Sequence, residues 1–360
     1  GFAPELIDSV MEEIVGMEQP YRYRNKAQFP IGADRDGMPV AGFYAARTHS
    51  IIPVEDCKLG VTQNEQILGT ALSYMRENGV RPYDETIGKG LVRHVLIRYG
   101  FTSKELMVCL VINGETLPQE KKLVDALCKI EGMTSISVNI NRKNTNVILG
   151  EETRTVWGSD YITDQIHLRD CDHDFALTDT AIAYHISPQS FYQVNPVQTE
   201  ILYQTAIDYA GLTGKETVID AYCGIGTIGL IAAKKAGKVI GVELNKDAVK
   251  DARINAKENK ITNAAFYQGD AGRFMVEMAA KGEKADVVFM DPPRAGSDER
   301  FLSSVVKLSP KKVIYISCNP ETLARDLKYL TKKGYQVKKI QPVEMFAFTE
   351  HVETVVLLSR

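Results

Sequence analysis

The sequence predicts an α/β fold in its C-terminal half, preceded by a smaller α+β antiparallel domain. From about residue 216 apolar strand segments alternate with helical patterns, which is typical of a parallel sheet covered by helices on both faces. Before residue 190 short alternating runs are broken by Asn, Gly and Lys turns, which is typical of antiparallel strands. We therefore expect two domains, at residues 1–190 and 191–360.

The C-terminal half has a regular order of elements. Apolar runs predict strands at 217–221, 238–243, 264–268, 285–290, 313–317, 335–345 and 352–358. Helical spacing predicts helices at 196–210, 228–236, 246–259, 271–280, 299–308 and 320–333. The last two strands are joined by a short link, so we expect one of them to be antiparallel.

The N-terminal half has weaker signals. They predict strands at 91–99, 105–112, 134–140 and 145–149, with helices near 60–79 and 118–130. Two stretches, "YRYRNKAQF" (21–29) and "LVRHVLIRYG" (91–100), interleave aromatic and basic residues. Such a pattern fits either contact with RNA or a half-buried strand with a solvated basic face.

Composition limits the class of protein. The net charge of −3 over 360 residues argues against a protein that coats nucleic acid but allows an enzyme with a local basic cleft. No apolar run has the length of a membrane span, so we expect no membrane association. The six cysteines are scattered without a CxxC pair, which is typical of reduced thiols. We expect a cytoplasmic monomer.

A glycine-rich turn follows the first strand of the C-terminal half. In "DAYCGIGTIGL" (220–230), Gly224, Gly226 and Gly229 have GxGxxG spacing, which lets a ligand approach the backbone closely. Glu243 ends the next strand, where its carboxylate can accept hydrogen bonds from a ribose diol. Nicotinamide enzymes and S-adenosylmethionine enzymes share both features, so this pair leaves the cofactor open.

The fourth strand ends in "FMDPPRAG", and this motif favours one cofactor. Asp-Pro-Pro at this place resembles S-adenosylmethionine-dependent methyltransferases, so we predict a Rossmann-like domain of that class. Asp270 in "YQGDA" matches the carboxylate that such enzymes place near the adenine. Enzymes that methylate exocyclic amines favour an aromatic after the prolines, whereas this chain has Arg294.

A cysteine follows the next strand, in "YISCNPETLARD" (315–326). Asn319 and Pro320 are typical of a helix start, so Cys318 is expected beside a helix N-terminus, which lowers the pKa of a thiol. Carbon 5 of a pyrimidine is a poor nucleophile. A thiolate that adds to carbon 6 creates an enolate that takes a methyl group at carbon 5, and a base must then remove the carbon 5 proton.

These motifs together resemble the bacterial RNA uracil-5-methyltransferase family over nearly the whole chain. The resemblance rests on "FYQVNP" (191–196), "DAYCGIGTIGL", "DPPRAG" (291–296), "SCNPETLARDL" (317–327) and "EMFAFTEHVETVVLLSR" (344–360). It implies that Cys318 is the nucleophile and that Glu353 takes the carbon 5 proton. For the other sites it implies S-adenosylmethionine contacts at Gln193, Tyr222, Glu243 and Asp291, lesser ones at Thr227 and Asp270, and substrate contacts at Phe191, Gln193, Asp291 and Arg294.

The chain departs from the family at its N-terminal end. Full-length members carry a β-barrel module and three cysteines that, with a fourth, hold a 4Fe–4S cluster. Cys57 stands where the resemblance puts the fourth ligand. Either the chain is N-terminally truncated, which we favour, or this member dispenses with the cluster. We expect no cluster in this chain and a 4Fe–4S cluster in the full-length form. The upstream extension implied by Cys57 favours 23S rRNA as the partner. The alternatives are a tRNA T-loop methyltransferase and an RNA-binding protein of this fold without turnover.

Overall fold

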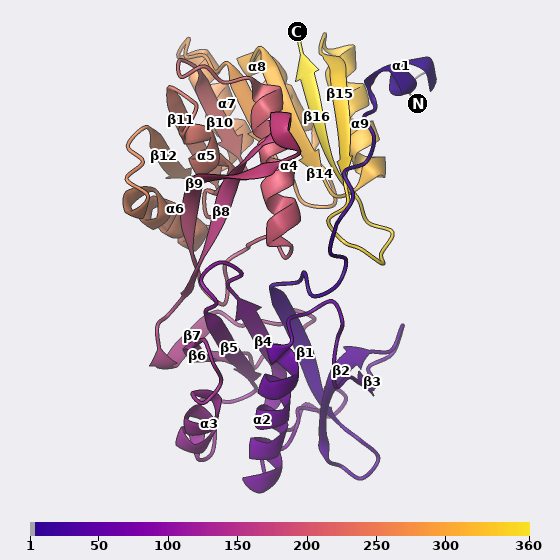
Figure 1. The fold of residues 1–360 in the computed structure, drawn as a ribbon, viewed down its shortest axis with the longest axis vertical. Helices are drawn as coiled ribbons and strands as arrows, with labels where there is room; N and C mark the ends of the chain where they lie inside the picture. The colour runs from indigo at the N-terminus through magenta and orange to yellow at the C-terminus, as the bar shows by residue number, and fades with distance from the viewer. Residues whose placement is uncertain (1–3) are drawn as a thin grey trace. The chain divides into compact units, whose positions relative to one another are not determined.

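The fold comes from a computed structural model that describes residues 4–360 (Figure 1). It contains two compact units. One comprises the described part of residues 1–18 together with 166–184 and 191–360, and the other comprises 19–165 and 185–190. We call them the C-terminal unit and the N-terminal unit. Among the helices described, none combines the length and apolarity needed to cross a bilayer.

The C-terminal unit is built on a sheet with strand order β12-β11-β10-β13-β14-β16-β15. The strands from β12 to β14 are parallel, whereas β16 is antiparallel to both β14 and β15. Their bounds are β10 Thr217–Ala221, β11 Lys238–Glu243, β12 Ala264–Gln268, β13 Val287–Met290, β14 Lys312–Ser317, β15 Gln336–Val343 and β16 Glu353–Ser359. The strand order reverses between β10 and β13, and open sheets bind ligands beyond the carboxyl ends of the strands at such a point.

Helices cover both faces of this sheet (Figure 1). Met275 of α7, Phe301 of α8 and Leu323 of α9 join one apolar cluster with side chains from β10, β13 and β14. On the other face α4 packs against β14 and β16, and α5 packs against β10 and β11. The helices are α4 Pro196–Ala210, α5 Thr227–Ala233, α6 Lys246–Glu258, α7 Ala271–Ala280, α8 Glu299–Leu308 and α9 Pro320–Lys332. The two-faced parallel sheet expected from the sequence is confirmed.

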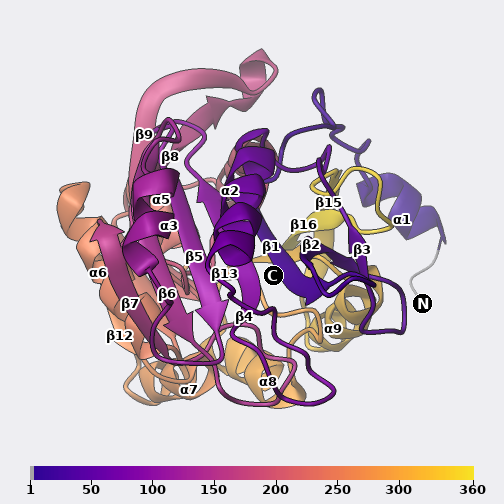
Figure 2. The same ribbon diagram turned by 90° about the horizontal axis from the view of Figure 1, so that it is seen from below.

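The N-terminal unit has a second sheet, with strand order β3-β2-β1-β4-β5-β6-β7. Helices α2 Gln63–Glu77 and α3 Glu120–Leu127 lie on one face of it, in front of the strands in Figure 2. Ile67, Met75 and Leu123 of these helices pack with apolar residues of β4, β5 and β6. The strands are β1 Lys26–Ala33, β2 Pro39–Tyr44, β3 Ile51–Pro53, β4 Val92–Tyr99, β5 Leu106–Ile112, β6 Met133–Ile140 and β7 Glu152–Gly158.

Two expectations for this unit are wrong. The sheet is not wholly antiparallel, because β5 and β6 are parallel, with α3 as the crossover between them. Residues 145–149 do not form a strand, and the next strand is β7. The reason is local: the Asn141 side-chain amide donates to the carbonyls of Val147 (2.7 Å) and Ile148 (3.0 Å), which holds this segment as a loop.

The division of the chain also differs from the boundary at residue 190. Strands β8 Ile162–Asp170 and β9 Ala176–Ile186 pair in a separate two-stranded sheet, joined through a 3₁₀ turn at Cys171–His173. Residues 166–184 of this hairpin pack with the C-terminal unit, because Glu200 of α4 accepts from the backbone N–H of His167 (2.8 Å) and from Arg169 Nε (2.8 Å). Helix α1 Pro4–Val10 belongs to the same unit.

Candidate active site

The glycine-rich turn between β10 and α5 adopts an unusual backbone. Tyr222, Gly224 and Gly226 all have positive φ, at 63°, 53° and 86°. Tyrosine rarely adopts this conformation, and such strain concentrates at functional sites. A Cβ added at Gly224 would meet nothing within 4 Å, so a ligand has space to approach the backbone there. The buried Asp220 carboxylate holds the turn from behind by accepting from Gly229 N at 2.7 Å.

Glu243 lies at the carboxyl end of β11, next to this turn. Its carboxylate accepts from Gly224 N (3.1 Å) and from Asn245 N (2.8 Å). A carboxylate offers about four lone-pair positions, so two remain for a ligand. The half-buried Glu243 can therefore hydrogen-bond the glycine turn and the hydroxyl groups of a ligand at the same time.

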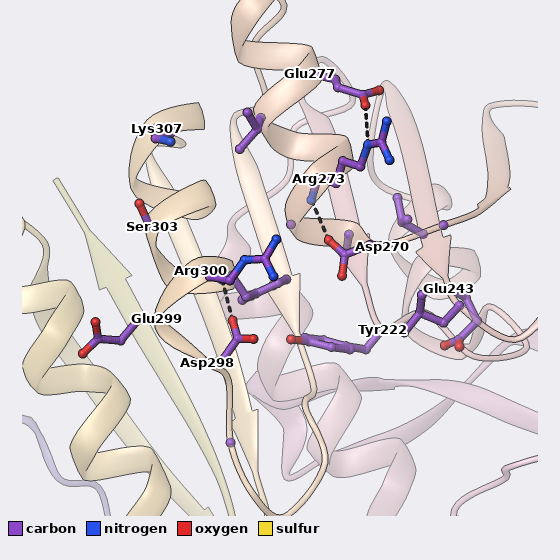
Figure 3. Close-up of a pocket in the computed structure, with 18 of the residues that line it drawn as sticks. Tyr222, Glu243, Asp270, Arg273, Glu277, Asp298, Glu299, Arg300, Ser303 and Lys307 are labelled. Carbon is purple, nitrogen blue, oxygen red and sulfur yellow. Dashed lines mark hydrogen bonds and ion pairs between the residues drawn. The ribbon is translucent and has the colours of Figure 1, made fainter.

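A cavity of about 980 Å³ is lined by Tyr222 and Glu243, whereas Gly224 and Gly226 of the turn lie outside its lining (Figure 3). Tyr222, Glu243 and Asp270 line one end of it, and Glu277 and Lys307 line its far end. Asp270 also caps α7, because its Oδ1 accepts from Arg273 N at 2.7 Å. The donor set fits S-adenosylmethionine: a carboxylate with free lone pairs suits a ribose diol, and an open glycine turn allows close backbone approach.

Three further predicted residues lie at the same edge of the sheet. Asp291 directly follows β13, Cys318 directly follows β14, and Glu353 begins β16. Because Ser317 pairs with Thr354 in the antiparallel register, Cys318 and Glu353 are the next residues on the two strands. Strand alternation puts Val288, Tyr315 and Val356 toward α7–α9, so Asp291, Cys318 and Glu353 continue the opposite, α4-facing side. We call these three residues the carboxylate–thiol cluster.

Burial controls the charges in the carboxylate–thiol cluster. It raises the pKa of Asp291 to about 7. It also raises the pKa of Glu353 to about 8, with a further increase from Asp291 and a decrease from the Arg294 guanidinium. Near neutral pH both groups can therefore gain or lose a proton, as acid–base catalysts must.

The sequence-based expectation of a lowered Cys318 pKa is wrong for the unliganded chain. Burial and then the Glu353 carboxylate raise the pKa of the Cys318 thiol, and the opposing effect of Arg294 is smaller. The start of α9 is as expected, since Asn319 Oδ1 accepts from Glu321 N at 3.0 Å and Pro320 is the first helical residue. The sequence argument considered only the helix N-terminus, whereas folding adds burial and two carboxylates.

The remaining predicted residues lie outside both the cavity lining and the contacts described for Cys318 and Glu353, apart from Asp291. Gln193 is buried and hydrogen-bonds Tyr203 of α4, which also hydrogen-bonds Thr227 and lies near Asp291. Gln193, Thr227 and Asp291 lie outside the lining of the large cavity. Phe191 is 71% exposed, and no contact described for it joins it to the carboxylate–thiol cluster.

Cys57 lies in the N-terminal unit, where it is half-buried. Its carbonyl accepts from Arg22 Nη1 at 3.1 Å. Within residues 4–360 no three His, Cys, Asp or Glu side chains are grouped so that they could hold a metal ion. The residues described here therefore do not fit a 4Fe–4S cluster, which needs four thiolates.

Sequence reasoning missed two residues at the site. Tyr203 was not singled out because α4 is buried on nearly all sides, so no amphipathic pattern marks the side facing the site. Asp220 was passed over although it opens the glycine motif. A buried acidic residue within an apolar strand, "TVIDA", was the available signal.

A doubly wound sheet with an open glycine turn, and with a thiol and two carboxylates at its strand ends, fits the class of S-adenosylmethionine-dependent methyltransferases. The family model for tRNA (uracil-5-)-methyltransferase matches residues 18–360, so the chain belongs to that family. It is an RNA methyltransferase that uses S-adenosylmethionine, which confirms the family and the Rossmann-like α/β fold that the sequence predicted for the C-terminal half.

Similar proteins agree with this assignment. An uncharacterized RNA methyltransferase from Halalkalibacterium halodurans is 46% identical over 345 residues, covering 96% of this chain and 72% of the relative. Another from Listeria innocua is 47% identical over 347 residues, covering 96% and 74%. Among solved structures, the Pyrococcus abyssi tRNA (uracil-54, C5)-methyltransferase in complex with S-adenosyl-L-homocysteine has a TM-score of 0.79. It is 27% identical and the match covers 98% of this chain and 81% of that one.

Proposed function

We propose that this chain methylates carbon 5 of a specific uridine in 23S rRNA through a covalent adduct between Cys318 and carbon 6. S-adenosylmethionine supplies the methyl group when bound. The observation that carries the proposal is the strand register, which brings Cys318 and Glu353 to adjacent positions beside Asp291. A nucleophile and a base within reach of one ring are what addition and elimination at carbons 6 and 5 require.

Each protein group has a defined task in this proposal. The Cys318 thiolate forms a bond to carbon 6, and the electron pair of the ring double bond becomes an enolate that gives carbon 5 its nucleophilicity. After methylation, Glu353 removes the carbon 5 proton. The electrons of that bond restore the double bond as the carbon–sulfur bond breaks and the thiolate leaves. The Arg294 guanidinium favours the thiolate, since it lowers the pKa of Cys318.

The binding roles are part of the same proposal. Glu243 holds the ribose of the cofactor, with Tyr222 and Asp270 beside it in the cavity and Gln193, Thr227 and Asp291 as further contacts. Phe191, Gln193, Asp291 and Arg294 contact the extruded uridine. The exposed ring of Phe191 supports this role, because flipped bases are bound by stacking on aromatic side chains.

The RNA target has two candidates. The upstream extension implied by Cys57 favours 23S rRNA. The match to the tRNA (uracil-5-)-methyltransferase family and the similarity to the Pyrococcus abyssi tRNA enzyme favour the T-loop of tRNA. Tritiated S-adenosylmethionine, incubated with separate rRNA and tRNA pools from cells lacking the enzyme, distinguishes them. Label in 23S rRNA alone supports our proposal, and label in tRNA alone contradicts it. Cys318→Ala should abolish labelling, whereas Cys171→Ala, which removes an exposed thiol elsewhere, should not.

The other predictions depend on the resemblance and on composition. A cytoplasmic monomer remains our expectation. A 4Fe–4S cluster in a longer form of the protein, with Cys57 as one ligand, also remains a prediction, and no step of the reaction is derived through it. Iron analysis and absorbance spectra of this chain, and of a form extended by three further cysteines, test the cluster: Cys57→Ser should remove colour only from the extended form.

A further inference from the structure

The motif that contains the nucleophile continues into Arg325 and Asp326, which the proposed reaction does not use. Asp326 is completely buried in α9, two turns after Cys318. A buried carboxylate is costly unless hydrogen bonds satisfy it. Its Oδ2 accepts from Ser297 N (2.8 Å) and from the Tyr315 hydroxyl (2.7 Å), and its Oδ1 accepts from Arg325 Nε (2.8 Å).

These partners belong to the two segments that flank the carboxylate–thiol cluster. Ser297 belongs to the loop that carries Asp291 and Arg294, and Tyr315 belongs to β14, which leads into Cys318. The Asp326 carboxylate therefore joins the loop after β13 to the strand before the nucleophile. The Ser297 hydroxyl also lies 3.4 Å from the Tyr222 hydroxyl, which lines the cofactor cavity.

Other side chains of α9 hold the same loop. Arg325 Nη2 donates to the carbonyls of Ala295 (2.9 Å) and Ser297 (3.0 Å). Asn319 Nδ2 and Thr322 Oγ1 both donate to the Arg294 carbonyl, each at 3.2 Å. We call Asn319, Thr322, Arg325 and Asp326 the α9 clamp.

The loop approaches the α9 clamp closely, at a glycine. Gly296 has a φ of +72°, and a Cβ there would lie 2.6 Å from Arg325 Nη2 and 2.7 Å from Asp326 Oδ2. Those separations are too short for any other residue without displacement of the clamp. The sequence thus supplies the side chains of the α9 clamp and also Gly296, which lets the loop pack against them.

We propose that the α9 clamp, with Asp326 at its centre, positions the Arg294 loop against Cys318 and thereby sets the reactivity of the nucleophile. The inference rests on the proposed function, in which Cys318 attacks the ring. Asp326 is a positioning residue in this account, because it acts through Ser297, Tyr315 and Arg325. Since a misplacement of about 1 Å can cost roughly 100-fold in rate, a clamp that fixes both partners is significant for catalysis.

The test compares Asp326→Asn and Tyr315→Phe with the wild-type protein and with Tyr335→Phe. Tyr335 is a matched control, because its buried hydroxyl donates to the Pro310 carbonyl at 3.0 Å in the same apolar core, away from the loop. Two quantities are measured on folded protein. One is the rate at which the covalent RNA adduct forms under single-turnover conditions. The other is the pH midpoint of Cys318 alkylation by iodoacetamide, followed by mass spectrometry of its peptide.

We expect adduct formation about 10- to 100-fold slower in Asp326→Asn, with affinity for S-adenosylhomocysteine within about threefold of wild type. The alkylation midpoint should move to higher pH as the Arg294 charge loses its position. Removal of the Asp326 charge alone would move the midpoint to lower pH, so the direction separates positioning from simple electrostatics. Tyr315→Phe, which changes no charge, should shift both quantities in the same sense by less.

Tyr335→Phe should lower the melting temperature without affecting either quantity. The inference is overturned if Asp326→Asn and Tyr315→Phe only lower the melting temperature, or if the midpoint in Asp326→Asn moves to lower pH. If Asp326→Asn does not fold, the adduct rate and the alkylation midpoint of Tyr315→Phe decide whether the inference holds. Failure of the proposed function is distinguishable, because Cys318→Ala would then still methylate RNA whatever the clamp variants do.

Discussion

Glu243 allows a quantitative test of the cofactor site. Its carboxylate accepts hydrogen bonds from Gly224 N and Asn245 N, which leaves two lone-pair positions that can accept from a ribose diol. Glu243→Gln keeps the shape but removes the charge and one acceptor oxygen. Hydrogen bonds to charged groups contribute about 1.5–3 kcal/mol each, so the loss of one should raise the Kd roughly 10- to 150-fold. Glu243→Ala removes every such bond and should weaken binding further.

Isothermal titration calorimetry with S-adenosylmethionine measures these affinities. Glu277→Gln is the matched control, because Glu277 lines the far end of the same cavity and pairs with Arg273 at 2.8 Å (Figure 3). It should leave the Kd unchanged. If Glu243→Gln and Glu243→Ala both bind as wild type does, Glu243 does not hold the ribose and the assignment of the cavity is wrong.

Three further predictions concern charge and stability. Glu353→Gln should raise the melting temperature above about pH 8 but not below about pH 4.5. The raised pKa of the folded-state Glu353 lowers stability only at pH values above the pKa of the unfolded state, by roughly 1.4 kcal/mol per pKa unit. A difference in melting temperature that does not depend on pH would contradict this prediction. Asp220→Ala should lower the free energy of unfolding by about 1–3 kcal/mol in urea titrations, and Asp220→Asn by less, because Gly229 N keeps an acceptor only in the latter. Arg294→Gln should move Cys318 alkylation to higher pH, since the guanidinium lowers the pKa of that thiol; an unchanged profile would refute this role.

Much of the C-terminal unit could be predicted from sequence because its signals are local. Helix α4 was predicted from helical spacing at 196–210, which are its observed bounds, and its start is encoded locally, because Asn195 caps it with its side chain and Pro196 is the first helical residue. By contrast, Asn141 turns residues 145–149 into a loop through hydrogen bonds that no alternation pattern reveals. The hairpin β8–β9 was not anticipated, and its attachment to Glu200 depends on contacts distant in sequence.

The sequence motifs named candidate site residues, whose roles stay predictions, but they did not reveal the electrostatics of the site. Motifs identified Cys318 and Glu353, and strand alternation would have put both on one face once the strand order was known. The pKa of Cys318 was mispredicted because it depends on burial and on Glu353, which is 35 residues away in sequence. Asp326 lies inside a recognised motif, yet its hydrogen bonds to Ser297 and Tyr315 appear only in the folded chain.

The division of labour between Cys318 and Glu353 can be tested in one measurement. Glu353→Gln is incubated with substrate RNA and S-adenosylmethionine carrying a labelled methyl group, and the products are separated on a denaturing gel. The loss of a general base costs about 10²- to 10⁴-fold in its own step, so elimination should stall after methyl transfer. We expect a labelled protein–RNA complex of shifted mobility, absent from Cys318→Ala and from the Glu353→Gln, Cys318→Ala double variant. Normal turnover by Glu353→Gln, or an adduct that forms without Cys318, would contradict the account.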